Sequence, residues 1–375
     1  MSSDVDDALA VMSLARGRRR RRVVTLTVGA AAVSLLVWRQ MDAIAARAKP
    51  YVRRRSRISH PALIVNRWSG DGKAERFGLA AAAEAAGIRV IMLERGDDIV
   101  QLAREAVESG ADAIGAAGGD GSLGLVAGVA IEHDVPFFCV PVGTRNHFAL
   151  DLGLDRDDPL SALEAIRDGD ELLIDYGTVG ERPFVNNVSF GVYAEAVHRD
   201  EYRENKEQTI ATVIKELTES GRQGAPIRFD GPGGGRAEQT AMTIVSTNPY
   251  VYSGHPDFGR RLRMDSGVMG VTAVAAGRGA DGVEGRAVRQ WETDRIVLES
   301  DSPILAGLDG EALTFESPLE IRLQPKALRV LVPKGVRPGY VPPREAFAAN
   351  VIGLAKLGGV PGATDATTGD IAPAG

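Results

Sequence analysis

The chain has 375 residues, of which 44% are hydrophobic and 25% charged, a composition typical of folded rather than disordered protein. A single cysteine excludes a disulfide scaffold and any zinc site built from several cysteines, and five scattered histidines are too few to suggest a histidine-rich metal centre. The first 60 residues hold 13 basic and 4 acidic side chains, so the net charge of −6 leaves −15 on the remainder, and general nucleic-acid binding by that remainder is disfavoured.

The basic N-terminus leads into an apolar segment. Residues 16–22 (RGRRRRR) precede Val23–Trp38, which has no charged side chain. As a helix it would reach about 24 Å, short of the ~30 Å hydrocarbon core. Three interpretations stay open: a short anchor or interfacial helix at an anionic membrane, a secretory signal, and a surface helix with an arginine tail. We favour residues 1–60 as a membrane-association segment on the cytoplasmic side, peripheral or held by a single short anchor.

Residues 61–171 alternate between apolar runs and helical patterns. This order predicts a parallel sheet with helices on both faces, an α/β domain. The predicted strands are Ala62–Val65, Ile88–Leu93, Ala111–Ala117 and Pro136–Val140, and the predicted helices are Lys73–Ala86, Asp97–Ser109 and Ser122–His133.

From residue 172 to 324 the pattern becomes β-rich and predicts an antiparallel, sandwich-like second domain with one strong helix near Gln208–Ser220. Residues 325–357, with a strand Ala327–Val332 and a helix near Arg344–Leu357, are expected to return to the first domain, and residues 358–375 to form a disordered tail. The predicted strands of the second domain are Leu172–Val179, Pro183–Ser189, Gln239–Thr247, Val268–Ala275, Arg295–Glu299 and Leu319–Leu323.

Polar, glycine-containing turns follow three of the strands in the first domain. They are Asn66–Gly72, Gly118–Ser122 (GGDGS) and Pro141–Ala149. Glycine turns at the carboxyl ends of parallel strands, ahead of helix N-termini, are typical of phosphate-binding sites. The alternative for the GGDGS loop is a strand-to-helix turn in which Asp120 or Ser122 is a helix cap.

Four motifs occur in the order seen in one family of enzymes: GGDGS, PVGTRNHFALDLGL, FVNNVSFG (184–191) and Leu308-Asp309-Gly310-Glu311. Over about residues 61–335 the chain resembles the diacylglycerol kinase-like lipid kinases, which share a nucleotide fold with the NAD kinases. The resemblance implies a two-domain NAD kinase/diacylglycerol kinase-like fold, in which an α/β nucleotide domain and an antiparallel β-sandwich domain flank a cleft.

The resemblance also implies roles for individual residues. Asp309 and Glu311 match the motif whose carboxylates are implicated as the base for the lipid hydroxyl, a role that an alcohol nucleophile requires. An ordinary hairpin turn is the alternative for Asp309-Gly310. The residues implied to bind ATP are Asn66, Ser69, Gly70, Gly118, Gly119, Asp120, Gly121, Ser122, Thr144 and Asn146.

The chain departs from the family pattern at three places. Gly124-Leu125 stands where many relatives have Asn-Glu, and His147 replaces an Asp. At the stretch that forms a structural magnesium site in relatives, this chain reads Asp265-Ser266-Gly267-Val268, with Ser at the usual Asp position. Asp265 and Val268 are therefore the metal ligands that we predict, with Asp265 shifted by one residue.

We expect an ATP- and Mg²⁺-dependent kinase of a membrane-lipid hydroxyl, with diacylglycerol the first candidate. The alternatives are a kinase of another acceptor, sphingoid, polyprenol or NAD-like, and a non-catalytic lipid-binding relative. The anionic membrane surface is an expected partner, nucleic acid is not, and a homodimer is left open. For Arg260, Arg261 and Arg263 we favour a solvated strand edge, and the alternative is an approach to lipid headgroups at the mouth of the cleft.

Overall fold

The computed structural model describes residues 52–53, 57–199, 212, 227–231, 236–237, 240–251, 260–275 and 288–339. The expected membrane segment Val23–Trp38, the helix 344–357 and the tail 358–375 lie outside these residues, as does the helix 208–220 apart from residue 212. Within the described ranges, no helix has both the length and the apolar character needed to cross a membrane.

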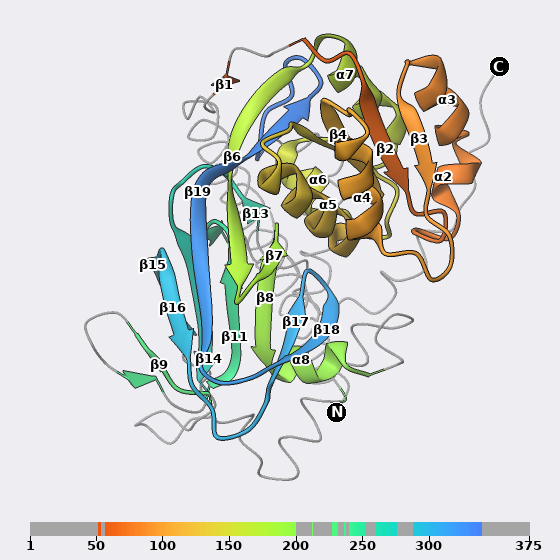
Figure 1. Cartoon of the computed structure of the whole chain (residues 1–375). Coiled ribbons are helices and arrows are strands. Elements are labelled where there is room, and N and C mark those ends of the chain that lie inside the picture. The colour runs from red at the N-terminus through yellow and green to blue at the C-terminus, as the bar shows by residue number, and fades with distance from the viewer. Residues whose placement is uncertain are drawn as a thin grey trace, which may run out of the picture. The chain divides into compact units, whose positions relative to one another are not determined.

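Four parallel strands form one end of the first sheet, in the order β5-β4-β2-β3, and Figure 1 labels β4, β2 and β3 among them. Their side chains are apolar on both faces, as expected for a parallel sheet covered on both sides. Ala62 and Ile64 face one cluster of buried side chains, while Leu63 and Val65 face another. These strands are β2 (Pro61–Val65), β3 (Arg89–Met92), β4 (Ala113–Gly118) and β5 (Phe137–Pro141).

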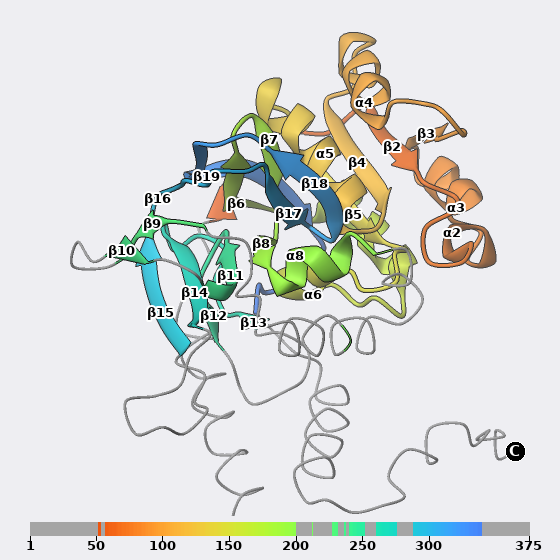
Figure 2. The same cartoon turned by 90° about the horizontal axis from the view of Figure 1, so that it is seen from below.

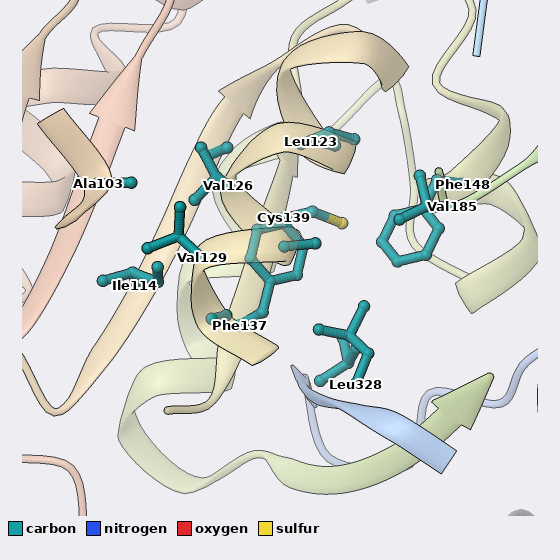
Figure 3. Close-up of a cluster of buried hydrophobic side chains, with 14 of the residues drawn as sticks. Ala103, Ile114, Leu123, Val126, Val129, Phe137, Cys139, Phe148, Val185 and Leu328 are labelled. Carbon is teal, nitrogen blue, oxygen red and sulfur yellow. The ribbon is translucent and has the colours of Figure 1, made fainter. Parts of the chain in front are cut away.

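Helices cover both faces of this sheet. On one face lie α4 (Ile99–Glu108), α5 (Asp120–Glu132) and α6 (His147–Leu152), and Figure 3 shows α5 side chains packed against β4 and β5 in that core. On the other face are α2 (Lys73–Arg76), α3 (Leu79–Ala85), the 3₁₀ helix η1 (Pro159–Leu163) and α7 (Glu164–Asp168). The predicted α/β arrangement is confirmed.

Two long strands extend the first sheet beyond its parallel part. β19 (Leu319–Val332) pairs in parallel with β5 and antiparallel with β6 (Asp170–Val179), and the two run side by side over most of their length (Figure 1). A register shift between Gln324 and Leu328 interrupts their pairing. The short strands β1 (Val52–Arg53), β7 (Arg182–Phe184) and β16 (Arg295–Leu298) complete this sheet among the described residues.

The second sheet is antiparallel, with the strand order β15-β14-β11-β8-β17-β18 (Figure 2). Its apolar face packs against the lower part of β6, β7, β16 and β19, so two sheets enclose one core that includes Phe190, Val271 and Ile321. This is the predicted β-sandwich. The strands are β8 (Asn187–Gly191), β11 (Thr240–Ser246), β14 (Met269–Ala275), β15 (Val288–Thr293), β17 (Ile304–Leu308) and β18 (Glu311–Phe315).

The remaining described elements are short. Helix α8 (Val192–Val197) follows β8, while β9 (Phe229–Asp230) pairs with β10 (Arg236–Ala237), and β12 (Tyr250–Val251) pairs with β13 (Arg260–Arg261).

The structure differs from the expected elements in two instructive ways. The helix expected over Lys73–Ala86 is two helices, because Gly78 adopts a left-handed conformation (φ +60°) between them. The expected boundary between residues 324 and 325 falls inside β19, which belongs to the parallel sheet at one end and to the sandwich at the other.

Candidate active site

The turns that follow β2, β4 and β5 lie against one another at the carboxyl end of the parallel strands. The backbone N–H of Asn66 donates to the carbonyl of Ala117 (2.9 Å), and that of Gly143 donates to the carbonyl of Gly118 (3.1 Å). The Asn66 side-chain amide reaches the Ser122 hydroxyl at 3.3 Å. The three predicted turns thus meet at the edge where open α/β sheets bind ligands.

Glycine is required where these turns pack most closely. Gly70, which follows Ser69 in the first turn, has φ +58°, and a Cβ atom there would lie 2.1 Å from the Val142 carbonyl oxygen. A Cβ at Gly143 would lie 2.5 Å from the Cα of Gly119. Both approaches are far below normal contact distances, so the turns pack backbone to backbone.

A cavity of about 360 Å³ opens beside these turns. It combines two cationic side chains, two carboxylates, an aromatic ring and a hydroxyl; the cations, the ring and the hydroxyl are groups that can bind a phosphate-bearing ligand with an aromatic part. Its volume is within the usual range for small-molecule sites. The lining residues are Gly70, Asp71, Lys73, Arg76, Phe77, Gly143, Thr144 and Asp157.

Asp120 is a helix cap, but of the helix after its own. Its two carboxylate oxygens accept the backbone N–H groups of His147 (3.1 Å) and Phe148 (3.0 Å), the first residues of α6. Helix α5, in which Asp120 itself lies, has no side-chain cap at its N-terminus. The acidic side chain therefore ties the GGDGS loop to the turn after β5, and its charge is met by the N-terminus of α6.

Asn146 shapes the turn after β5 from within. It is buried with φ +53°, and its side chain accepts the Gly143 N–H at 2.9 Å and donates to the Gly143 carbonyl at 2.6 Å. Thr144, by contrast, is exposed and lines the cavity. Of the two residues implied to bind ATP here, Thr144 offers a hydroxyl to a ligand and Asn146 holds the backbone in place.

Asp309 lies at the tip of the β17–β18 hairpin. With Gly310 it forms a two-residue loop in which both residues have positive φ (+47° and +91°), as in a type I′ turn. Its Oδ2 accepts the N–H of Val185 at 2.8 Å, and its Oδ1 accepts those of Asn186 (2.9 Å) and Asn187 (3.0 Å). The hairpin interpretation is therefore correct, and the same turn places the Asp309 carboxylate within hydrogen-bond distance of the backbone N–H groups of residues 185–187.

The environment of Asp309 favours exchange of a proton near neutral pH. Burial, with a smaller contribution from the nearby Asp120 carboxylate, raises the pKa of Asp309 to about 7, while the three N–H donors oppose the rise. A carboxyl group with a pKa near the working pH is a suitable general base. Among the described residues, Oδ2 accepts one N–H bond, which leaves a further lone pair on that oxygen.

Helix α5 brings the GGDGS loop and the two carboxylates together. A Cβ at Gly121 would lie 2.2 Å from Glu311 Oε1, and one at Gly124 would lie 3.1 Å from Asp309 Oδ2. The carboxylates of both predicted catalytic residues, which come from the β17–β18 hairpin, therefore pack against the first turns of α5. Gly124, where many relatives have Asn, leaves the space next to Oδ2 open.

The predicted metal ligands already have protein partners. Asp265 Oδ1 pairs with Arg263 Nε at 2.9 Å, and the Val268 carbonyl accepts the Ser266 hydroxyl at 3.1 Å. Among the described residues no group of three or more His, Cys, Asp or Glu side chains could hold a metal ion. These contacts compete with a magnesium ion for Asp265 and Val268, and this site stays a prediction.

Arg261 was expected at a solvated edge, and this prediction is wrong. Its side chain is completely buried, and its Nε pairs with Asp151 Oδ2 at 2.6 Å. Arg261 and the 185–187 backbone both contribute to the surroundings of Asp309. The FVNNVSFG motif marked that backbone, whereas nothing in the local sequence around Arg261 identifies its partner, 110 residues earlier.

Known proteins resemble this chain in sequence and in fold. Residues 60–179 fit the family model described as "Diacylglycerol kinase catalytic domain". Over this segment the chain is similar to the diacylglycerol kinases. Over 130 residues it is 32% identical to the diacylglycerol kinase of Mycobacterium tuberculosis, covering 34% of this chain and 42% of that one. Over 104 residues it is 36% identical to a Chromohalobacter salexigens protein named probable lipid kinase YegS-like, covering 27% and 33% of the two chains.

The matched segments span about two-fifths or less of these relatives' lengths. Solved structures extend the likeness of fold to the sandwich. Two crystal structures of diacylglycerol kinase-type proteins from Bacillus anthracis superpose with TM-scores of 0.57 and 0.53 at 17% and 16% identity. They cover 75% and 74% of this chain and 98% of their own. The two-domain fold expected from the motifs is confirmed.

Proposed function

We propose that the protein is an ATP-dependent lipid kinase that phosphorylates a hydroxyl group of a membrane lipid, with diacylglycerol as the first candidate and phosphatidic acid as its product. The observation that carries the proposal is Asp309, a carboxyl group with a pKa near 7 that lies against the helix following the GGDGS loop. The relatives' names support a lipid acceptor.

In the proposed reaction the lipid hydroxyl gives its proton to Asp309 Oδ2, the oxygen with a lone pair to spare. The alkoxide oxygen then forms a bond to the γ-phosphorus, the bond from that phosphorus to the bridging oxygen breaks, and ADP leaves with the electron pair. Three backbone N–H groups hold the Asp309 carboxylate in one orientation throughout. Glu311 is the second acidic group at this position.

The cavity beside the three turns is the proposed nucleotide site. Lys73 and Arg76 supply positive charge for phosphates, Phe77 a ring face for the base, and Thr144 a hydroxyl donor. Mg²⁺ neutralises charge on a transferring phosphoryl group when it is bound to the nucleotide. We infer that this ion would arrive with the nucleotide, whose phosphate oxygens are suitable Mg²⁺ ligands, separately from the ion predicted at Asp265 and Val268.

The test is transfer of label from [γ-³²P]ATP to lipids in mixed micelles containing diacylglycerol, ceramide, sphingosine, phosphatidylglycerol or polyprenol, with NAD as a soluble acceptor. The matched variants are Asp309→Asn and Glu311→Gln, with ATP affinity and melting temperature measured in parallel. A labelled lipid that disappears in Asp309→Asn, with ATP affinity retained, supports the proposal and identifies the acceptor.

Two other outcomes would contradict it. ATP binding with no labelled product favours a non-catalytic lipid-binding relative, and labelled NAD favours a kinase of a soluble acceptor.

We also propose that residues 1–60 hold the enzyme at an anionic membrane, where its substrate is found. Flotation of the full chain with phosphatidylglycerol vesicles is expected, and neutralising the arginines of residues 18–22 with glutamine should abolish it. Flotation that survives this change at low salt would refute the electrostatic part of the proposal.

A further inference from the structure

Arg261 is a fully buried cation with four hydrogen-bond partners. Its Nε pairs with Asp151 of α6 at 2.6 Å, and its Nη2 donates to Asn186 Oδ1 at 2.6 Å. Its Nη1 donates to the Val185 carbonyl at 2.5 Å and also to the Thr247 hydroxyl. A buried guanidinium that satisfies this many groups fixes the position of each of them, because losing any one leaves a buried charge poorly paired.

The segment that Arg261 holds is the one that binds Asp309. The Val185 carbonyl and the Asn186 N–H belong to one peptide group, so a cation on the carbonyl strengthens the N–H as a donor to Asp309. The Asn186 carbonyl accepts the Thr247 N–H at 3.0 Å, and the Asn187 N–H of that next peptide also donates to Asp309. The backbone is thus bonded on its carbonyl side by Arg261 and Thr247, and on its N–H side by Asp309.

Charged and titratable groups from five elements lie around Asp309. On α5, β6, β12, β13 and β18 these are Asp120, Tyr176, Tyr250, Arg261 and Glu311. Four of them are acidic or neutral, and Arg261 is the cation of this set. Its positive charge opposes the effect of Asp120 and favours the ionised form of the Asp309 carboxyl.

We propose that Arg261 is a positioning residue, which holds the 185–187 backbone so that Asp309 stays aligned and ionised as the proton acceptor. The role rests on the proposed kinase function, and Asp151 is the anchor that keeps the guanidinium in place. A purely structural role would lower stability alone, whereas positioning also sets the pH at which Asp309 loses its proton.

The test compares Arg261→Gln and Arg261→Lys with a matched control. Arg329→Gln removes another arginine with little exposure, whose ion pairs are with Glu171 and Asp134 and which contacts none of the five groups around Asp309. For each protein kcat is measured from pH 5.5 to 9, together with the melting temperature. Backbone amide shifts of Val185, Asn186 and Asn187 are followed over the same range by NMR, because these N–H groups report the protonation of Asp309 without any turnover.

In Arg261→Gln we expect the acidic midpoint of kcat, and that of the three amide shifts, to move to higher pH. The loss of kcat should be at least about tenfold at pH 6 and smaller at pH 9. Arg261→Lys, which keeps the charge but not the fork of donors, should move the midpoint less, and it serves as the test if the glutamine variant does not fold. Arg329→Gln should lower the melting temperature but leave the midpoints of kcat and of the three amide shifts at their wild-type pH.

The proposal is overturned if kcat of the Arg261 variants falls by the same factor at every pH, or if Arg329→Gln moves the midpoint equally. If the wild type phosphorylates no lipid at any pH, the proposed function fails, and the amide titration still decides whether Arg261 controls Asp309.

Discussion

Replacing Gly124 with alanine separates the proposed proton acceptor from the stability of the fold. The glycine lies inside α5, where alanine is the better helix former by about 1 kcal/mol. The new Cβ would lie 3.1 Å from Asp309 Oδ2 and 3.9 Å from Val185 Cγ2, so the carboxylate must yield by a few tenths of an ångström while the apolar contact is normal.

The two effects have opposite signs. Better helix propensity raises the melting temperature by roughly 1–2 °C for a protein of this size, unless the displaced carboxylate cancels the gain. The methyl group covers the side of Oδ2 where a lipid hydroxyl must approach, and proton transfer by a positioned group is worth about 100- to 10,000-fold. We therefore expect kcat to fall at least about tenfold, with ATP affinity unchanged.

The assay is lipid phosphorylation in mixed micelles at saturating ATP, with kcat and KM for the lipid determined separately and unfolding followed by calorimetry. A double variant with Asp309→Asn provides the control, because Gly124→Ala should have no further effect once the acceptor is gone. A Gly124→Ala enzyme that keeps the wild-type kcat would show that Oδ2 does not receive the proton.

Other perturbations of the site have equally definite outcomes. Folding raises the pKa of Asp309 from 3.8 to about 7, so the folded state binds more protons than the unfolded state between these pH values. The free energy of unfolding should therefore decline as pH rises from about 4 to 7. In urea titrations, Asp309→Asn should lack this part of the decline. Gly70→Ala places a Cβ 2.1 Å from a carbonyl oxygen at φ +58°, so ATP affinity by calorimetry should fall at least about tenfold, and unchanged affinity would remove that turn from the nucleotide site. Asp120→Ala removes the cap of α6 and should lower the free energy of unfolding by about 1 kcal/mol in denaturant titrations. An unchanged free energy of unfolding would show that water replaces the carboxylate as the cap. If Asp265 and Val268 hold a structural metal, EDTA should lower the melting temperature of the nucleotide-free protein by several degrees, and an unchanged melting temperature would remove that site in favour of the Arg263–Asp265 ion pair.

The parts of the fold that sequence predicted well are those determined by local patterns. Strand β2 and helix α4 follow from their apolar patterns. The helix was expected to begin at Asp97, and its N-cap is the next residue, Asp98, whose side chain accepts the Val100 N–H at 2.8 Å. The three glycine turns were recognised because each follows a buried strand. Local patterns missed β15, β17 and β18, which lie in or at the edge of an antiparallel sheet and whose pairing is decided by distant partners.

The sequence identified individual residues of the candidate site, but not the contacts between residues that are far apart in the chain. Asp120 was recognised as either a ligand or a cap, but its partners in α6 lie 27 and 28 residues later, beyond the reach of a local capping rule. Arg261 was placed on the surface because a run of arginines on a short strand is normally solvated. Its burial depends on Asp151 and Asn186, which are 110 and 75 residues away, and no periodicity encodes such a pairing.

These connections explain why departures from the family pattern are compatible with catalysis. Helix α5 starts at the loop that contacts the turn after β5, and two of its first five positions are glycines that admit Glu311 and Asp309. One rigid helix therefore sets the distance between the phosphate-side turns and the proposed base. Asp120 raises the pKa of Asp309 from one side, and the Arg261 cation favours its ionised form from the other. The proton affinity of the proposed base is thus raised chiefly by burial and adjusted by these two charges, and neither of them has to contact the lipid.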